Sequence, residues 1–283
     1  MFLCVNKVRL CLVIGNVHVN VNQLLIKMHR KSFQRSLSCS WHQLNAKQIP
    51  SNLKGKSKSS QEWLLRQLAD PYVEKARMMN YRCRSAFKLL EIDDKYKIIS
   101  PGNIIIDCGA APGSWTQVAA ERCNANGKVD NKPLGAVFSI DLLHIHPVTG
   151  ATILGGMDFT KTESQLRLKK ALDGKRVNCV LSDMAPNATG VKMIDQENII
   201  NLCYAVLKFA LAMSSTQANL LMKVWDNADV PKLEKDLERF YANVKRVKPR
   251  ASRGDSSEHF LLARNYKGID HVANHFESNR GKS

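Results

Sequence analysis

The stretch IIIDCGAAPGSWTQ, residues 104–117, sets the fold class of this chain. It passes from an apolar run of strand length through a turn of small residues into a helical segment, an arrangement in which a glycine loop can approach a nucleotide-like ligand. Gly109 and Gly113 are four residues apart with Pro112 between them, whereas a dinucleotide-binding loop has the spacing G-x-G-x-x-G. The stretch therefore predicts a strand–loop–helix unit, and a Rossmann oxidoreductase is its weakest interpretation.

The alternation of strand-length and helix-length segments continues along the chain. Strands are predicted at residues 103–108, 136–140, 177–182, 219–224 and 256–264. Helices are predicted at residues 61–68, 82–92, 115–122, 163–172, 196–213 and 231–241, and a surface loop at 124–135. Such alternation is typical of βαβ units, so we predict a single α/β domain built on a mostly parallel sheet.

Charge is distributed unevenly over the 283 residues. The chain has 42 Lys and Arg against 25 Asp and Glu, a formal net charge of +17, and such an excess attracts polyphosphates. The first 61 residues contain ten basic side chains and no acidic one. An acid-free basic leader is typical of a mitochondrial presequence, with a disordered RNA-binding arm as the alternative. We predict a leader at 1–60, one catalytic domain at 61–267 and a disordered C-terminal tail at 268–283.

Three further features restrict the class of protein. The apolar stretch 10–26 is interrupted by Asn, His and Gln side chains, so no stable membrane insertion is expected. The eight cysteines form no C-x-x-C pair, which indicates reduced thiols in a mitochondrial matrix or cytosolic protein. His144 and His146 have no Cys, Asp or His partner at ligand spacing, so no metal site is predicted.

Acidic side chains accompany the glycine loop. Asp107 precedes the turn, Asp141 ends the next strand, and Asp158 follows a third one. Carboxylates repel a diphosphate but suit a sulfonium, an α-amino group and ribose hydroxyls, so the expected cofactor is S-adenosyl-L-methionine. The alternative for each aspartate is an ordinary helix cap or turn residue.

Six segments resemble one known family, in order and over roughly residues 61–267. They are RCRSAFKLLEI (82–92), DCGAAPGSW (107–115), DLL (141–143), SDMAPNATG (182–190), LLMKVW (220–225) and SRGDSSEHFLLA (252–263). The chain resembles the FtsJ/RrmJ-like ribose 2′-O-methyltransferases, and the segment DLLHIHPVTGATIL with the leader is similar to the mitochondrial branch, which modifies a uridine of large-subunit rRNA. The resemblance implies a seven-stranded, mostly parallel sheet with an antiparallel last strand.

The resemblance also implies the functional residues. The catalytic tetrad falls on Lys88, Asp183, Lys223 and Glu258. The cofactor-binding residues fall on Asp107, Gly109, Pro112, Gly113, Ser114, Trp115, Asp141, Asp158 and Asp183. Ser114 departs from the second glycine that bacterial relatives often have there. Independently of the resemblance, Lys223 interrupts an apolar strand, where a lysine is costly unless it is paired.

Methyl transfer to a ribose 2′-hydroxyl requires a positioned hydroxyl and a group that handles its proton. Lys223 is a candidate for the base or for a cation that stabilises the developing alkoxide. Burial and the nearby Lys88 favour a neutral amine, whereas the carboxylates of Asp183 and Glu258 favour the charged one, so both roles stay open.

Two basic clusters are candidates for phosphate contacts. They are formed by Arg82 with Arg84 and by the segment KRVKPRASR at 245–253, with a solvated surface as the alternative. The expected partner is large-subunit rRNA or the large-subunit particle, and a monomer is favoured. The alternatives are a tRNA or nucleolar rRNA methyltransferase, and a ribosome-assembly factor whose catalysis is dispensable.

Overall fold

The computed structural model describes residues 12–14, 17–19 and 57–268, and the chain divides into the two units Met1–Ala69 and Asp70–Ser283. The described part of the first unit has the antiparallel strands β1 (Leu12–Ile14) and β2 (Val17–Val19) and the helix α2 (Lys58–Leu68). Helix α2 confirms the predicted helix and begins three residues earlier, after Ser57, whose hydroxyl accepts a hydrogen bond from Ser60 N. Most of the predicted leader and of the C-terminal tail lies outside the described residues.

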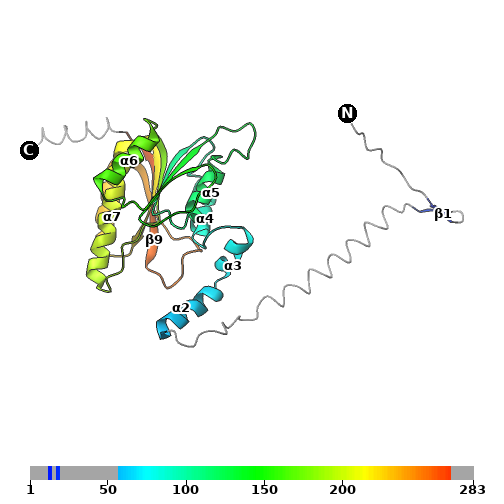
Figure 1. The fold of residues 1–283 in the computed structure, drawn as a ribbon, viewed down its shortest axis with the longest axis horizontal. Coiled ribbons are helices and arrows are strands. Elements are labelled where there is room, and N and C mark those ends of the chain that lie inside the picture. The colour runs from blue at the N-terminus through cyan, green and yellow to red at the C-terminus, as the bar shows by residue number, and fades with distance from the viewer. Residues whose placement is uncertain (1–11, 15–16, 20–56, 269–283) are drawn as a thin grey trace, which may run out of the picture. The chain divides into compact units, whose positions relative to one another are not determined.

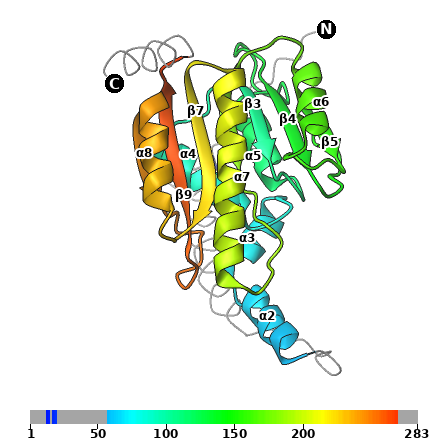
Figure 2. The same ribbon diagram turned by 90° about the vertical axis from the view of Figure 1, so that its left-hand side faces the viewer.

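The second unit is built on a seven-stranded sheet with the order β5-β4-β3-β6-β7-β9-β8. Its strands are β3 (Ile104–Cys108), β4 (Ala136–Asp141), β5 (Ala151–Gly155), β6 (Val177–Ser182), β7 (Ser214–Trp225), β8 (Tyr241–Val247) and β9 (Glu258–Tyr266). Strand β9 is antiparallel to its neighbours β7 and β8, and the pairs from β5 to β7 are all parallel (Figure 2). The predicted mostly parallel sheet with an antiparallel last strand is confirmed.

Helices cover both faces of this sheet. On one side lie α4 (Ala86–Tyr96) and α5 (Ser114–Arg122), and on the other α6 (Thr162–Leu172), α7 (Lys192–Met213) and α8 (Val230–Phe240) (Figures 1 and 2). Helix α3 (Pro71–Met78) packs against α4. The central strands are buried on both faces, which explains their continuous apolar runs in the sequence.

Some predicted boundaries were wrong, and each error has a local cause. Helix α4 begins at Ala86, not at residue 82, so Arg82 and Arg84 lie in the turn before it. Strand β8 was missed because only Tyr241 and Val247 at its two ends are buried while charged side chains lie between them. Strand β5 is a short edge strand whose side chains are only partly buried, and it too carries a weak signal. The surface loop at 124–135 is confirmed.

Two absences apply to the described residues. None of their helices combines the length and the hydropathy that a membrane span needs. No three of their His, Cys, Asp and Glu side chains gather in a way that could hold a metal ion.

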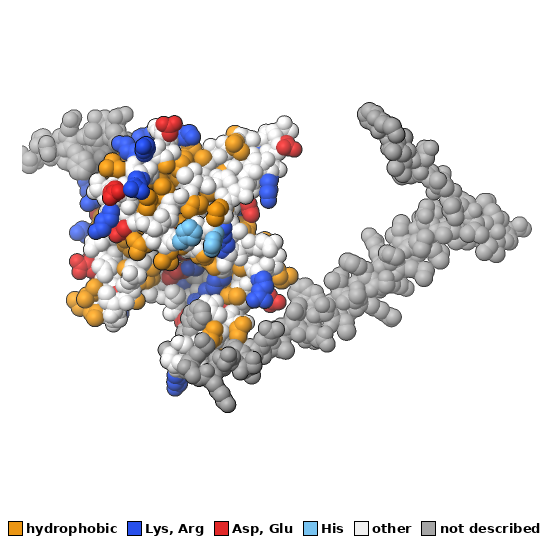
Figure 3. Space-filling model, viewed as in Figure 1, with side chains coloured by type: hydrophobic (Ala, Val, Ile, Leu, Met, Phe, Trp, Pro, Cys, Tyr) orange, Lys and Arg blue, Asp and Glu red, His pale blue; other side chains and the backbone are white. Residues whose placement is uncertain are grey.

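The rings of His144 and His146 meet edge to face with their centroids 5.5 Å apart, in an exposed segment after β4. Histidine and hydrophobic side chains lie next to one another on the face drawn in Figure 3.

Candidate active site

The loop between β3 and α5 is shaped by two glycines and a buried acid. Gly109 and Gly113 have backbone φ values of +76° and +108°, which residues other than glycine rarely adopt. Asp107 has no exposed surface, and its Oδ2 accepts a hydrogen bond of 2.7 Å from Thr116 Oγ1. Burial, together with the negative charges of Asp183 and Asp141, raises the pKa of Asp107 to about 7, although the hydrogen bond from Thr116 acts in the opposite direction. In this arrangement Asp107 connects the end of β3 to the first turn of α5, the two elements that bound the loop.

The loop is tied to the segment that precedes α4. The guanidinium of Arg82 donates to the carbonyl oxygens of Pro112, His146 and Pro147, each at 2.7 Å. The Cys83 thiol donates to Ser114 Oγ at 3.0 Å. Arg82 therefore links the glycine loop to the loop that follows β4. Backbone oxygens take three of its five N–H groups, which leaves fewer donors for the predicted phosphate contact.

Trp115 connects the same segment to the start of α5. Its indole Nε1 donates to the Ser85 carbonyl at 2.9 Å, and its buried ring lies 5.6 Å from that of Phe260. Trp115 thus connects the start of α5 with the residue before α4, the helix that carries Lys88, and with strand β9, which carries Glu258.

Carboxylates lie at or after the carboxyl ends of three parallel strands, β4, β5 and β6, and β3 with the glycine loop lies between β4 and β6. Asp141 ends β4 and accepts hydrogen bonds from Ala111 N at 2.8 Å and Leu143 N at 2.7 Å, one on each oxygen. Asp158 follows β5, and hydrogen bonds from the hydroxyl and the backbone N–H of Thr160 lower its pKa. Asp183 follows β6. Asp158 thus acts in part as a turn residue, as the alternative interpretation of the sequence predicts.

These donors and acceptors fit S-adenosylmethionine. Each Asp141 oxygen accepts one backbone bond and retains a lone pair for a ribose hydroxyl, and Asp158 Oδ2 has no protein partner in the described chain. The carboxylates meet positive charge and hydroxyl groups favourably, whereas a diphosphate would be repelled. Gly109, Pro112, Gly113, Ser114 and Trp115 form the adjoining loop and helix start.

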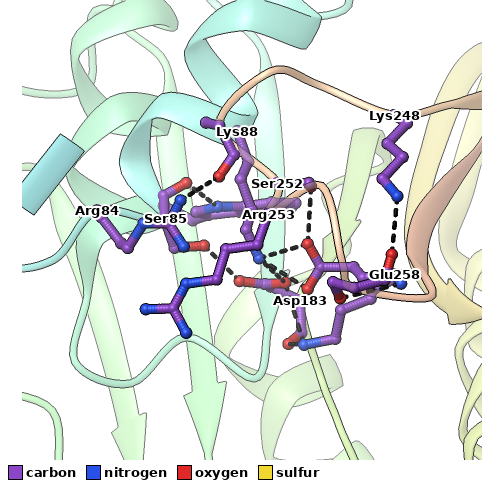
Figure 4. Close-up of polar contacts among 12 residues, drawn as sticks. Arg84, Ser85, Lys88, Asp183, Lys248, Ser252, Arg253 and Glu258 are labelled. Atoms are coloured by element: carbon purple, nitrogen blue, oxygen red, sulfur yellow. Dashed lines mark hydrogen bonds and ion pairs between the residues drawn. The ribbon is translucent and has the colours of Figure 1, made fainter. Parts of the chain in front are cut away.

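The four residues of the predicted tetrad lie together, although they come from α4, β7, β9 and the end of β6. Figure 4 shows three of them, Lys88, Asp183 and Glu258. Lys223 Nζ donates to the Asp183 carbonyl at 2.6 Å and lies 3.2 Å from Asp183 Oδ1. Lys88 Nζ lies 2.7 and 2.8 Å from the two oxygens of Glu258, and 4.0 Å from Asp183 Oδ1. Two cations and two anions thus form one nearly buried, charge-balanced chain.

Two serines complete this cluster, and sequence reasoning missed both. Ser85 Oγ donates to Asp183 Oδ2 at 2.6 Å, and Ser252 Oγ donates to Glu258 Oε1 at 2.8 Å. Each carboxylate is therefore held by one lysine and one serine. Both serines stand inside segments that the resemblance had singled out, but a serine there has no periodicity or spacing that distinguishes it from a helix cap or a turn residue.

An open α/β sheet that gathers carboxylates around its first loop is the architecture of an S-adenosylmethionine-dependent methyltransferase. The model of the FtsJ-like methyltransferase family matches residues 81–266. The chain therefore belongs to the FtsJ-like methyltransferase family and uses S-adenosylmethionine as its methyl donor.

The similarity of this chain to individual proteins supports this assignment. The chain is 76% identical over 223 residues to "rRNA methyltransferase 2, mitochondrial" of Drosophila melanogaster, covering 79% of this chain and 89% of that protein. It is 42% identical over 215 residues to "Ribosomal RNA large subunit methyltransferase E" of Cereibacter sphaeroides, covering 76% and 87%. A crystal structure of a Plasmodium falciparum protein described as a ribosomal RNA methyltransferase superposes with a TM-score of 0.58 at 26% identity, covering 66% of this chain and all of that one.

Proposed function

We propose that this methyltransferase modifies the 2′-hydroxyl of a uridine in mitochondrial large-subunit rRNA and supports the assembly of the mitochondrial ribosome. One observation carries the proposal: Lys223, which interrupts the apolar strand β7, is held by Asp183 at the same sheet edge as the glycine loop. The names of the Drosophila and Cereibacter relatives support rRNA as the substrate.

The cofactor side of the site binds and orients. S-adenosylmethionine supplies, when bound, a methyl group on a positively charged sulfur. Asp141 accepts ribose hydroxyls, Asp158 accepts polar groups farther along the nucleoside, and the loop from Gly109 to Gly113 lets the backbone approach. Arg82 and Trp115 hold this loop in place.

The catalytic side holds the sugar oxygen and its developing charge. A charged Lys223 amine has three N–H bonds, of which one is donated to the Asp183 carbonyl. Asp183 Oδ1 lies 3.2 Å away as an ion-pair partner, so an N–H bond is left for the 2′-oxygen. That contact strengthens as negative charge grows on the oxygen, so it acts on the transition state more than on the bound substrate. Lys88 and Glu258 keep Asp183 in position and balance the charge of the cluster.

The catalytic proposal is tested with Lys223→Ala. Tritium transfer from S-adenosylmethionine to large-subunit rRNA is expected to fall at least about 100-fold, because the contact to the reacting oxygen is lost. Lys169→Ala, an exposed lysine of α6, is the matched control and keeps the wild-type rate. A wild-type rate for Lys223→Ala rejects the mechanism. Complementation of a null strain by Lys223→Ala would favour the assembly-factor alternative.

The cellular location is proposed to be the mitochondrial matrix. The acid-free basic composition of residues 1–60 and the name of the Drosophila relative support it. A fusion of residues 1–60 to a reporter should be imported into isolated mitochondria and protected from added protease. If the reporter stays outside, a tRNA or nucleolar rRNA substrate is favoured, and mapping the ribose methylations lost on depletion identifies it.

A further inference from the structure

Most basic side chains of the two predicted clusters are occupied by the protein's own oxygens. Arg82 is bound to three carbonyls, and Lys248 Nζ donates to the carbonyls of Ser256 at 2.7 Å and Gly254 at 3.4 Å. Arg246 Nη2 donates to Glu234 Oε2 at 2.6 Å. A guanidinium or amine that already binds a carbonyl or carboxylate has less capacity for a phosphate, so these residues are poor candidates for an RNA contact.

Arg84 and Arg253 share the carboxylate of Asp70 but lie at different distances from it. Asp70 Oδ2 lies 2.9 Å from Arg84 Nε but 3.8 Å from Arg253 Nε. Arg84 Nη2 also donates to the Ala251 carbonyl at 2.6 Å, so Arg84 has two protein partners, the Asp70 carboxylate and this carbonyl. Two positive charges therefore face one negative charge, and the uncompensated one belongs to Arg253, whose side chain is 30% exposed.

The position of Arg253 is fixed by its neighbours in the loop before β9. Ser252 is bonded to Glu258, Ala251 N donates to Glu91 Oε2 at 3.2 Å, and Lys248 closes the loop through Gly254 and Ser256. Figure 4 shows the Arg253 side chain between Arg84 and Asp183, beside the tetrad. Arg253 directly follows Ser252, which holds a tetrad carboxylate.

We propose that Arg253 binds a backbone phosphate of the substrate RNA next to the nucleotide whose 2′-hydroxyl is methylated. The inference rests on the proposed function. Asp70 faces Nε, and both Nη nitrogens have no protein partner among the described residues, so a planar pair of donors is available to phosphate oxygens. The sharing of Asp70 with Arg84 orients Arg253 without neutralising it.

The test measures equilibrium binding of a fluorescent large-subunit rRNA fragment at several KCl concentrations, together with methyl transfer. Arg253→Gln should weaken RNA binding about tenfold and reduce the slope of log affinity against log salt by about 0.7 to 0.9. The KM for RNA should increase more than kcat decreases. Arg253→Lys keeps the charge, so it should retain the salt slope while losing part of the affinity.

Arg167→Gln is the matched control, because it removes an exposed arginine of α6 whose only ion pair among the described residues is with Glu163, at 3.1 Å. It should leave affinity and slope unchanged. Wild-type affinity and slope for a folded Arg253→Gln overturn the inference. If that variant does not fold, Arg253→Lys decides: a raised KM with the wild-type slope supports the contact, and wild-type affinity rejects it. Failure of the proposed function is separate, since it appears as absent methyl transfer by the wild-type protein.

Discussion

Replacement of Ser85 by alanine tests how the tetrad is positioned. Ser85 Oγ donates to Asp183 Oδ2 at 2.6 Å, and that carboxylate uses Oδ1 to face Lys223 at 3.2 Å. The Ser85 hydroxyl makes no capping bond to helix α4, and its carbonyl, which accepts from Trp115, is kept in the variant. The substitution therefore removes one contact to Asp183 while the fold and the glycine loop are preserved.

The expected loss follows from the strength of that contact. A hydrogen bond to a charged group contributes about 1.5 to 3 kcal/mol, and each 1.4 kcal/mol is about a factor of ten in rate. If the whole contact serves to orient Asp183 and hence Lys223, kcat falls by about 10- to 150-fold. The KM for S-adenosylmethionine should change little, since Ser85 acts through Asp183 on the sugar side of the site.

Single-turnover methylation of rRNA at saturating cofactor is the assay, with thermal unfolding measured in parallel. Ser85→Thr restores a hydroxyl and should recover much of kcat, which a purely structural role would not require. Ser252→Ala removes the hydrogen bond from Ser252 to Glu258. In the double variant with Ser85→Ala, its added effect on kcat should be smaller than its effect alone, because both serines support one connected cluster. A kcat for Ser85→Ala within twofold of wild type refutes the positioning role.

Two further outcomes are expected elsewhere in the site. Arg82→Ala removes the three hydrogen bonds from Arg82 to the carbonyls of Pro112, His146 and Pro147, which tie the glycine loop to the loop after β4. The Kd for S-adenosylmethionine in calorimetry should therefore rise about tenfold, and an unchanged Kd would contradict the linking role. Burial raises the pKa of Asp107 to about 7 in the folded chain, whereas in the unfolded chain this carboxyl loses its proton above about pH 4. Between these pH values only the folded chain keeps the proton, so the free energy of unfolding decreases as pH rises toward 7. Asp107→Asn should flatten this part of the unfolding-temperature profile between pH 5 and 8; an unchanged profile would show that the acid is ionised throughout.

The elements that sequence predicted well are those buried on both faces or marked by strong periodicity. Strand β6 was predicted with its observed ends, and the start of helix α5 differs by one residue. Strand β8 was missed, and a strand before Asp158 was expected but given no bounds, because edge strands bury only part of their residues and carry little apolar signal.

The sequence alone gives the composition, the order of the helices and strands and the motifs that contain the tetrad. The helices, strands and motifs can be recognised because each depends on residues a few positions apart. The serines and the surplus charge of Arg253 cannot be found in this way. Ser85 meets Asp183 across 98 residues and Lys88 meets Glu258 across 170, and the same folding occupies Arg82 with backbone oxygens that no spacing rule identifies. Which hydrogen bonds a polar side chain makes depends on the groups that packing brings within about 3 Å of it, and those distances exist only after the sheet has assembled.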